Sequence, residues 1–114
     1  MRKPFLVLVM SVALPISAFG ATDEKTFQTC KANLKAAKKL DLLYDMQWKP
    51  PLEPVVVVGP TYDTLPFDVR ENFVLTLNCF FTAGKNDKYI NFPILDYKTH
   101  KEVARFSWGQ LSTD

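Results

Sequence analysis

The stretch VVVVGPTYDTLPFD, residues 55–68, is laid out like a strand, a loop and the start of a helix. A phosphate-binding loop has this layout and offers a row of backbone N–H groups, usually from glycines, together with a lysine. Here Pro60 and Pro66 lack the N–H group, no lysine follows the loop, and Asp63 and Asp68 would repel an anion. The stretch therefore indicates an ordinary strand-to-helix connection rather than a phosphate site.

The same loop is a candidate contact point for a partner protein. Connecting loops run over the protein surface, so we expect Tyr62 and Asp63 to be exposed. A tyrosine beside an acid can make both apolar and polar contacts with a partner. Tyr62 and Asp63 are therefore predicted partner-binding residues.

A second candidate surface consists of lysines. Lys31, Lys35, Lys38 and Lys39 fall within an arc of about 100° if their segment is a helix with 3.6 residues per turn. Such a stripe could dock on an acidic protein or on another anionic surface, such as phospholipid headgroups. The alternative is an ordinary solvated helix face, which is what most charge runs are.

The residues that could do hydrolytic chemistry are few. His100 is the only histidine, and Ser107 and Ser112 lie outside any G-x-S-x-G motif. Carboxylates such as Glu71 and Glu102 show no spacing that singles out a catalytic pair. The sequence predicts no catalytic set, no metal site and no cofactor. A small secreted hydrolase or toxin that uses carboxylates with His100 is the alternative to a binding function.

Aromatic residues offer a third class of site. Trp48 and Trp108, with Phe106, Tyr89 and Tyr97, could line a groove for a small molecule. In a domain this small, aromatic side chains more often form the core and its satellite packing. A small-molecule binder with an aromatic groove is therefore a further alternative function.

The N-terminus has the layout of a secretory signal peptide. MRKP carries two positive charges, and the apolar run FLVLVMSVALPISAFG ends in small residues. Ala18 and Gly20 occupy the −3 and −1 positions of a cut before Ala21. We therefore expect residues 1–20 to be removed, and the protein to be periplasmic or secreted, with no stable membrane insertion after cleavage.

The charge of the mature chain excludes one class of partner. Removing residues 1–20 from the 114 leaves 94 residues. It also removes Arg2 and Lys3, so the mature chain has 12 basic and 12 acidic residues. A chain so close to neutral does not attract nucleic acid through its net charge. Its length suits one domain, residues 21–114.

Cys30 and Cys79 are the only cysteines, and both belong to the predicted mature chain. In an exported protein, an even number of cysteines indicates a disulfide. The loop of about 50 residues closed by this pair would stabilise the fold by about 4 kcal/mol. Two buried free thiols are the alternative.

Hydrophobic periodicity defines the predicted elements. The run from residue 73 to residue 81 is ambiguous. Its apolar residues alternate as in a strand; they are Phe73, Leu75, Leu77, Cys79 and Phe81. Helical spacing favours a helix instead, as do Pro66 near its start and Gly84 just past its end. The predicted elements are a helix over 22–45, a proline-rich connector over 47–54 anchored by Trp48 and Leu52, a strand over 54–58, a helix over 64–84, and strands over 89–97 and 102–108.

These elements predict an α+β domain of two layers, in the order α-β-α-β-β, with two helices packed on a small, mainly antiparallel sheet. Pro93 implies an edge position or a bulge for the strand over 89–97. A disulfide between Cys30 and Cys79 would clamp the two helices together. The sequence therefore favours a small exported bacterial protein that binds another envelope or secreted protein, as an accessory subunit or an inhibitor.

Overall fold

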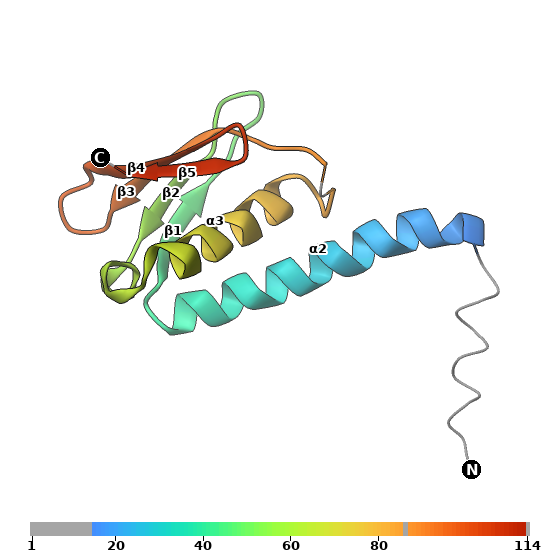
Figure 1. Ribbon diagram of the computed structural model, residues 1–114, viewed down its shortest axis with the longest axis horizontal. Coiled ribbons are helices and arrows are strands. Elements are labelled where there is room, and N and C mark those ends of the chain that lie inside the picture. The colour runs from blue at the N-terminus through green and yellow to red at the C-terminus, as the bar shows by residue number, and fades with distance from the viewer. Residues whose placement is uncertain (1–14, 86, 114) are drawn as a thin grey trace, which may run out of the picture.

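The computed structural model describes residues 15–85 and 87–113 (Figure 1). Most of the predicted signal peptide lies outside these residues, and cleavage before Ala21 stays a prediction. The described chain forms α2 (Pro15–Lys39), β1 (Leu43–Gln47), β2 (Val55–Val58), a 3-10 turn η1 (Pro60–Thr64), α3 (Phe67–Phe81), β3 (Phe92–Asp96), β4 (Glu102–Ser107) and β5 (Gln110–Thr113).

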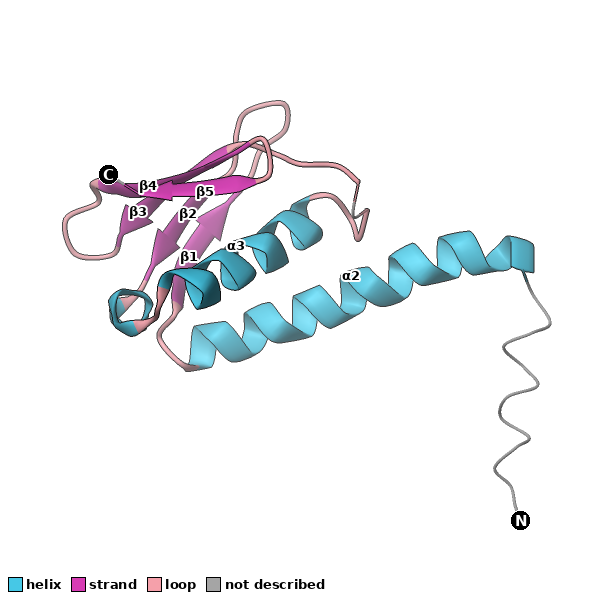
Figure 2. Ribbon diagram, viewed as in Figure 1, coloured by secondary structure: helices cyan, strands magenta, loops and turns pink. Residues whose placement is uncertain are grey.

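The five strands form one sheet in the order β1-β2-β3-β4-β5. Three pairs are antiparallel, and β2 and β3 are parallel. Both helices lie on the same side of this sheet, side by side (Figure 2). The prediction of an α+β domain with two helices on a mainly antiparallel sheet is therefore confirmed, although β1 and β5 are absent from the predicted order.

The core lies between the sheet and α3. Alternate strand residues point toward the helices because side chains along a strand have a period of two. α3 contributes Val74 and Leu77, which are fully buried, and α2 contributes Leu34 and Ala37. The inward-facing strand residues with at most 1% exposure are Val56, Val58, Phe92, Ile94, Ala104 and Phe106.

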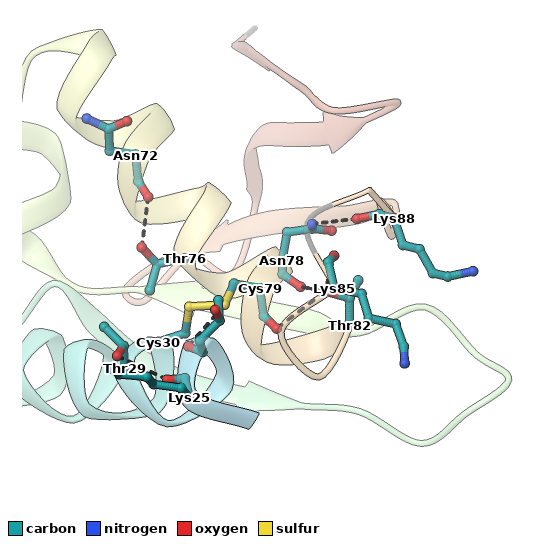
Figure 3. The surroundings of a disulfide bond; sticks show 11 residues. Lys25, Thr29, Cys30, Asn72, Thr76, Asn78, Cys79, Thr82, Lys85 and Lys88 are labelled. Atoms are coloured by element: carbon teal, nitrogen blue, oxygen red, sulfur yellow. Dashed lines mark hydrogen bonds between the residues drawn. A yellow bond between two sulfur atoms is a disulfide. The ribbon is translucent and has the colours of Figure 1, made fainter. Parts of the chain in front are cut away.

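A disulfide joins Cys30 on α2 to Cys79 on α3 (Figure 3). The two Cα atoms are 6.2 Å apart, within the usual range for disulfides. Phe27 and Phe80 stack beside it, with ring centroids 5.4 Å apart. The predicted clamp between the two helices is confirmed.

The first helix ends earlier than the predicted 22–45. α2 stops at Lys39, and Asp41 adopts a left-handed conformation with φ of 59°. The N–H group of Leu42 then donates to the carbonyl of Ala37 over 3.0 Å, which completes a Schellman-type helix end. No helix in the described part of the chain is both long and apolar enough to cross a membrane.

Because the helix ends at this turn, residues 43–47 form an edge strand instead of its last turns. Leu40 and Tyr44, which we expected on the apolar face of the helix, are 65% and 56% exposed. Tyr44 lies where the register between β1 and β2 shifts, and its ring contacts Tyr97 at a centroid distance of 5.7 Å.

The connector between β1 and β2 is anchored by one of its two predicted residues. The Trp48 ring meets Phe81 edge-on at a centroid distance of 5.4 Å, and its Nε1 donates to the carbonyl of Leu52 over 2.9 Å. Leu52 itself is 68% exposed, so its predicted role as a core anchor is wrong.

α3 confirms the choice of helix for the ambiguous run within 64–84. The helix ends with Ala83 and Gly84 at φ of 58° and 86°, and the N–H group of Gly84 donates to the carbonyl of Cys79 over 2.9 Å. A side chain at Gly84 would collide with the backbone carbonyl of Asp23 on α2. Glycine is therefore required both by its conformation and by the close approach of the two helices.

The last three strands form a meander in which β3 is the central strand of the sheet. Of the two alternatives predicted for Pro93, the edge position is therefore wrong, whereas an irregularity of the kind expected for a bulge lies next to it in β3. The parallel ladder with β2 begins only at Ile94, so the missing N–H group of Pro93 does not interrupt it. The register between β3 and β4 shifts directly after Ile94. The unpredicted β5 follows a two-residue turn made of Trp108 and Gly109.

Candidate functional site

A hollow of about 290 Å³ lies between α2 and β1, and three of the four predicted stripe lysines line it. We call it the lysine hollow. Its walls come from three elements that the chain brings together only in the folded state. They are Lys31, Leu34, Lys35 and Lys38 from α2, Leu43, Asp45 and Met46 from β1, and Phe80 from α3.

The floor of the lysine hollow is apolar and continuous with the core. Leu34 and Leu43 are each 4% exposed and belong to the main core cluster. Met46 and Phe80 are partly buried and pack against that cluster. A partner side chain that entered the hollow would therefore contact apolar groups that are packed against the core.

The rim of the hollow carries a net positive charge. Lys31, Lys35 and Lys38 recur at helical spacing, so they project from one side of α2 around the buried Leu34. Asp45 is the only acid among the lining residues. No ion pair between described residues includes any of these three lysines. Their charges are therefore free to meet an acidic ligand.

Lys39, the fourth lysine of the predicted stripe, is exposed but does not line the hollow. It follows Lys38 directly, and a step of about 100° around the helix axis carries its side chain away from β1. The structure therefore narrows the predicted four-residue stripe to three lysines and adds a facing wall from β1.

The predicted exposure of Tyr62 is wrong. Its side chain is 2% exposed, and its ring packs against Phe73 at a centroid distance of 6.3 Å. The turn η1 points this residue inward. The Tyr62 hydroxyl is buried without a hydrogen-bond partner among the described groups. Burial raises the pKa of Tyr62, while the nearby Arg70 cation opposes that shift and the Asp63 carboxylate adds to it.

Arg70 holds the loop that contains Tyr62. Its Nε and Nη2 atoms donate to the carbonyls of Tyr62 and Asp63, each over 3.0 Å, and its guanidinium lies 4.9 Å from the centre of the Tyr62 ring. Asp63 is exposed as predicted. It lies on a loop held by internal contacts, and it does not line the lysine hollow.

Of the aromatic residues predicted to form a groove, Tyr89 and Phe106 lie together, with ring centroids 6.3 Å apart, but none of the five lines the lysine hollow. Phe106 is fully buried in the core, and Tyr97 pairs with Tyr44. Trp48 packs on Phe81, whereas Trp108 is 85% exposed in the turn between β4 and β5. Neither Trp48 nor Trp108 lines the lysine hollow.

Of the carboxylates suggested for hydrolysis, Glu102 lies 3.9 Å from the Nη1 atom of Arg105. His100 is exposed in the turn between β3 and β4, where its backbone N–H group donates to the backbone carbonyl of Asp96 over 2.8 Å. The Asp96 carboxylate accepts hydrogen bonds from the N–H groups of Thr99 and Lys98, and the bond from Thr99 is the main cause that lowers its pKa. The Asp96 carboxylate therefore stabilises the turn between β3 and β4. Within residues 15–85 and 87–113, no group of three His, Cys, Asp or Glu side chains is placed to hold a metal ion.

A second hollow of about 290 Å³ lies between α2 and α3. Its lining contains apolar and uncharged polar side chains, among them Leu40, Val69 and Asn72, and no charged residue. It therefore has the shape of a groove but lacks the electrostatic preference that distinguishes the lysine hollow.

Sequence reasoning missed the β1 half of the site. Leu43, Asp45 and Met46 line the hollow because they belong to an edge strand, whereas the sequence pattern predicts a helix through residue 45 and a connector from residue 47. Searches with this chain found no matching protein-family model, no similar curated protein and no similar solved structure.

Proposed function

We propose that this chain is a small exported protein that binds an acidic segment of another envelope or secreted protein in the lysine hollow, and so acts as an accessory subunit or an inhibitor. The observation that carries the proposal is the combination of an apolar floor, which includes Leu34 and Met46, with three lysines that form no ion pair with another described residue. A site of this kind favours a ligand that has both negative charge and apolar side chains.

Each part of the hollow contributes something different to binding. Burial of a partner's apolar side chain against the floor would supply affinity, as buried anchors do at other interfaces. The lysines would attract acidic groups and favour one orientation of the partner. Asp45, on the opposite wall, would disfavour a uniformly acidic ligand.

The size of the hollow supports a protein ligand over a cofactor. Its 290 Å³ is at the lower limit of the volumes that bury small ligands, so it suits one or two side chains of a larger partner. The hollow is also bordered by β1, which is an edge strand of the sheet. A partner segment can therefore approach from the side without displacing another strand.

The proposal is tested by photo-crosslinking in the producing cells. A photoreactive amino acid replaces Met46 in the hollow, and a second protein carries it at Thr99 in the distant turn between β3 and β4. We expect one dominant crosslinked partner from position 46 and none of the same mass from position 99. The partner's binding region should be acidic.

The same experiment is repeated with charge-reversed variants. Reversal of Lys31, Lys35 and Lys38 to Glu should abolish the crosslink. Reversal of three lysines elsewhere provides the control, because it changes the net charge by the same amount; the control residues are Lys25, Lys98 and Lys101. If the crosslink survives the first set, or if both sets abolish it, the lysine hollow is not the binding site.

A further inference from the structure

One end of the sheet gathers three turns that are far apart in the sequence. The loop over 48–54 leaves β1 at the same end at which β3 begins and β4 finishes, as the strand register requires. Residues 82–85 and 87–91 and the turn between β4 and β5 meet there as well (Figure 1). We call this region the loop end.

Trp108 is the most exposed large apolar residue of the loop end. Its side chain is 85% exposed, and its φ of 53° lies in the left-handed region. With Gly109 at φ of 81°, it forms a two-residue turn of the kind that favours Asn or Gly at the first position. A tryptophan here is strained and gains almost no packing within the chain, so the fold itself does not account for it.

Tyr89 lies beside this turn, and its side chain is also exposed to solvent. Its side chain is 52% exposed, and its ring lies only 3.2–3.3 Å from the point that a Cβ atom on Gly109 would occupy. The buried Asn78 side chain holds the chain on both sides of Tyr89. It donates to the carbonyl of Lys88 over 2.9 Å (Figure 3). It also accepts from the N–H group of Ile90 over 2.8 Å. The position of Tyr89 is therefore fixed.

The loop over 48–54 adds a third exposed apolar side chain. Leu52 is 68% exposed, and its backbone is held by the indole of Trp48, whose ring rests on Phe81. The N–H group of Leu52 also donates to the carbonyl of Lys49 over 3.0 Å. This loop therefore presents Leu52 on a backbone that its own contacts maintain.

The charged residues around these side chains are mainly basic. Asp87 is the only acid on the segment over 82–91, and Glu53 is engaged by Arg105, whose Nη2 lies 2.9 Å from both carboxylate oxygens. The exposed lysines of the loop end are Lys49, Lys85 and Lys88.

We propose that the loop end docks on the surface of an anionic phospholipid membrane, with Trp108, Tyr89 and Leu52 inserted at the level of the headgroups. Tryptophan and tyrosine favour this interface because their rings are apolar and their N–H and O–H groups stay hydrated. The surrounding lysines would meet the lipid phosphates while their alkyl chains lie along the apolar layer.

The arrangement favours a lipid surface over a protein or a sugar. The three apolar side chains project from separate turns, and neither hollow described above lies among them. A fluid interface accommodates such separate projections, whereas a folded partner needs a continuous, complementary patch. This inference uses residues outside the lysine hollow and does not depend on the proposed function.

The test uses the processed, oxidised protein and vesicles made of equal parts phosphatidylglycerol and phosphatidylcholine. We expect the protein to sediment with these vesicles and to remain in solution with vesicles of phosphatidylcholine alone. The tryptophan fluorescence of this protein should shift to shorter wavelength with the anionic vesicles, and Trp108→Asn, which keeps Trp48, should lose that shift. Absence of sedimentation with the anionic vesicles would overturn the proposal.

Trp108→Asn separates docking from folding. It removes the indole but supplies a residue that the turn prefers, so the unfolding midpoint should stay the same or rise. Vesicle affinity should fall at least about tenfold, because the principal inserted side chain is gone. Unchanged vesicle affinity in this variant would contradict the proposed role of Trp108.

A matched pair of double variants tests the charges. Lys85→Glu with Lys88→Glu should reduce binding to the anionic vesicles by about tenfold or more. Lys98→Glu with Lys101→Glu changes the net charge equally but lies in the turn between β3 and β4, at the opposite end of the sheet. An equal loss of vesicle affinity in the two double variants would mean that binding depends on net charge and that the loop end is not the docking surface.

Discussion

Lys38 and Lys39 are consecutive residues in the last turn of α2, yet only Lys38 lines the lysine hollow. Both side chains are exposed, and both lie where a positive charge stabilises the end of a helix. Reversal of either charge should therefore affect the helix equally, and any difference in binding should come from the hollow.

We expect Lys38→Glu to weaken binding of the crosslinked partner by about tenfold and Lys39→Glu by less than about twofold, since only the first reversal places an acid beside the ligand. Titration calorimetry with the purified partner measures both affinities. The unfolding midpoints of the two variants should agree. Similar losses of affinity would show that the stripe acts through its overall charge.

Tyr62→Phe should stabilise the protein by about 1 kcal/mol, because it removes a buried hydroxyl that has no hydrogen-bond partner among the described residues. It should also change the alkaline behaviour. Burial raises the pKa of Tyr62 above its ordinary value of 10.0, so the unfolded chain loses this proton first. The free energy of unfolding should therefore fall as the pH rises past about 10 toward the folded pKa, and this contribution should disappear in the variant.

Urea denaturation at neutral pH and at several alkaline pH values measures both effects of Tyr62→Phe. Tyr44→Phe is the control, because Tyr44 is 56% exposed on the edge strand. If the two variants have the same stability and the same alkaline response, the Tyr62 hydroxyl is not buried without a partner.

Asn78→Asp should destabilise the protein by about 2 kcal/mol or more, although the two side chains have almost the same shape. The change removes the donor to the Lys88 carbonyl and places a carboxylate oxygen against it in a buried site. Asn72→Asp, on the exposed side of the same helix, should change stability far less. Chemical denaturation at neutral pH compares the two, and equal effects would contradict the anchoring role of Asn78.

Replacement of Cys30 and Cys79 by serine should destabilise the domain by about 2–4 kcal/mol, because the bond closes a long loop whose freedom the reduced chain regains. Denaturation of the double variant and of the reduced native protein should give similar values. A loss below about 1 kcal/mol would mean that helix packing alone holds α2 against α3.

The parts of the fold that the sequence predicts are those with strong periodicity. Both helices, the valine strand and the first two strands of the meander are marked by runs of apolar residues at the spacing of one element type. The disulfide follows from an even number of cysteines in a chain that the sequence predicts to be exported, and the structure places Cys30 and Cys79 on the two helices as expected.

The missed elements depend on turns without the usual markers. Asp41 ends α2 in a left-handed conformation, with no Gly or Pro to signal the stop, and Leu40 and Tyr44 continue the helical spacing past it. β5 follows a turn that begins with Trp108 instead of Asn or Gly. In both places the tertiary structure decides a local conformation that the sequence pattern leaves ambiguous.

The candidate site could be predicted only in part for the same reason. The lysines are visible from helical spacing, but Asp45 and Met46 face them only because the chain turns back as β1. The loop position of Tyr62 predicts an exposed side chain, whereas its ring points inward and packs against Phe73, and Arg70 holds its backbone. Such long-range contacts leave no periodic signal.

The parallel pairing of β2 with β3 also determines the order in which the sheet can assemble. β1 with β2, and β3 with β4 and β5, are each connected by short segments, whereas α3 lies between β2 and β3 in the described chain. Short loops close quickly, and pairings over longer separations form late because more chain entropy must be lost first. We therefore expect the hairpin of β1 and β2 and the meander of β3, β4 and β5 to form early. The parallel pairing of β2 with β3 should form only when α3 packs against both strands.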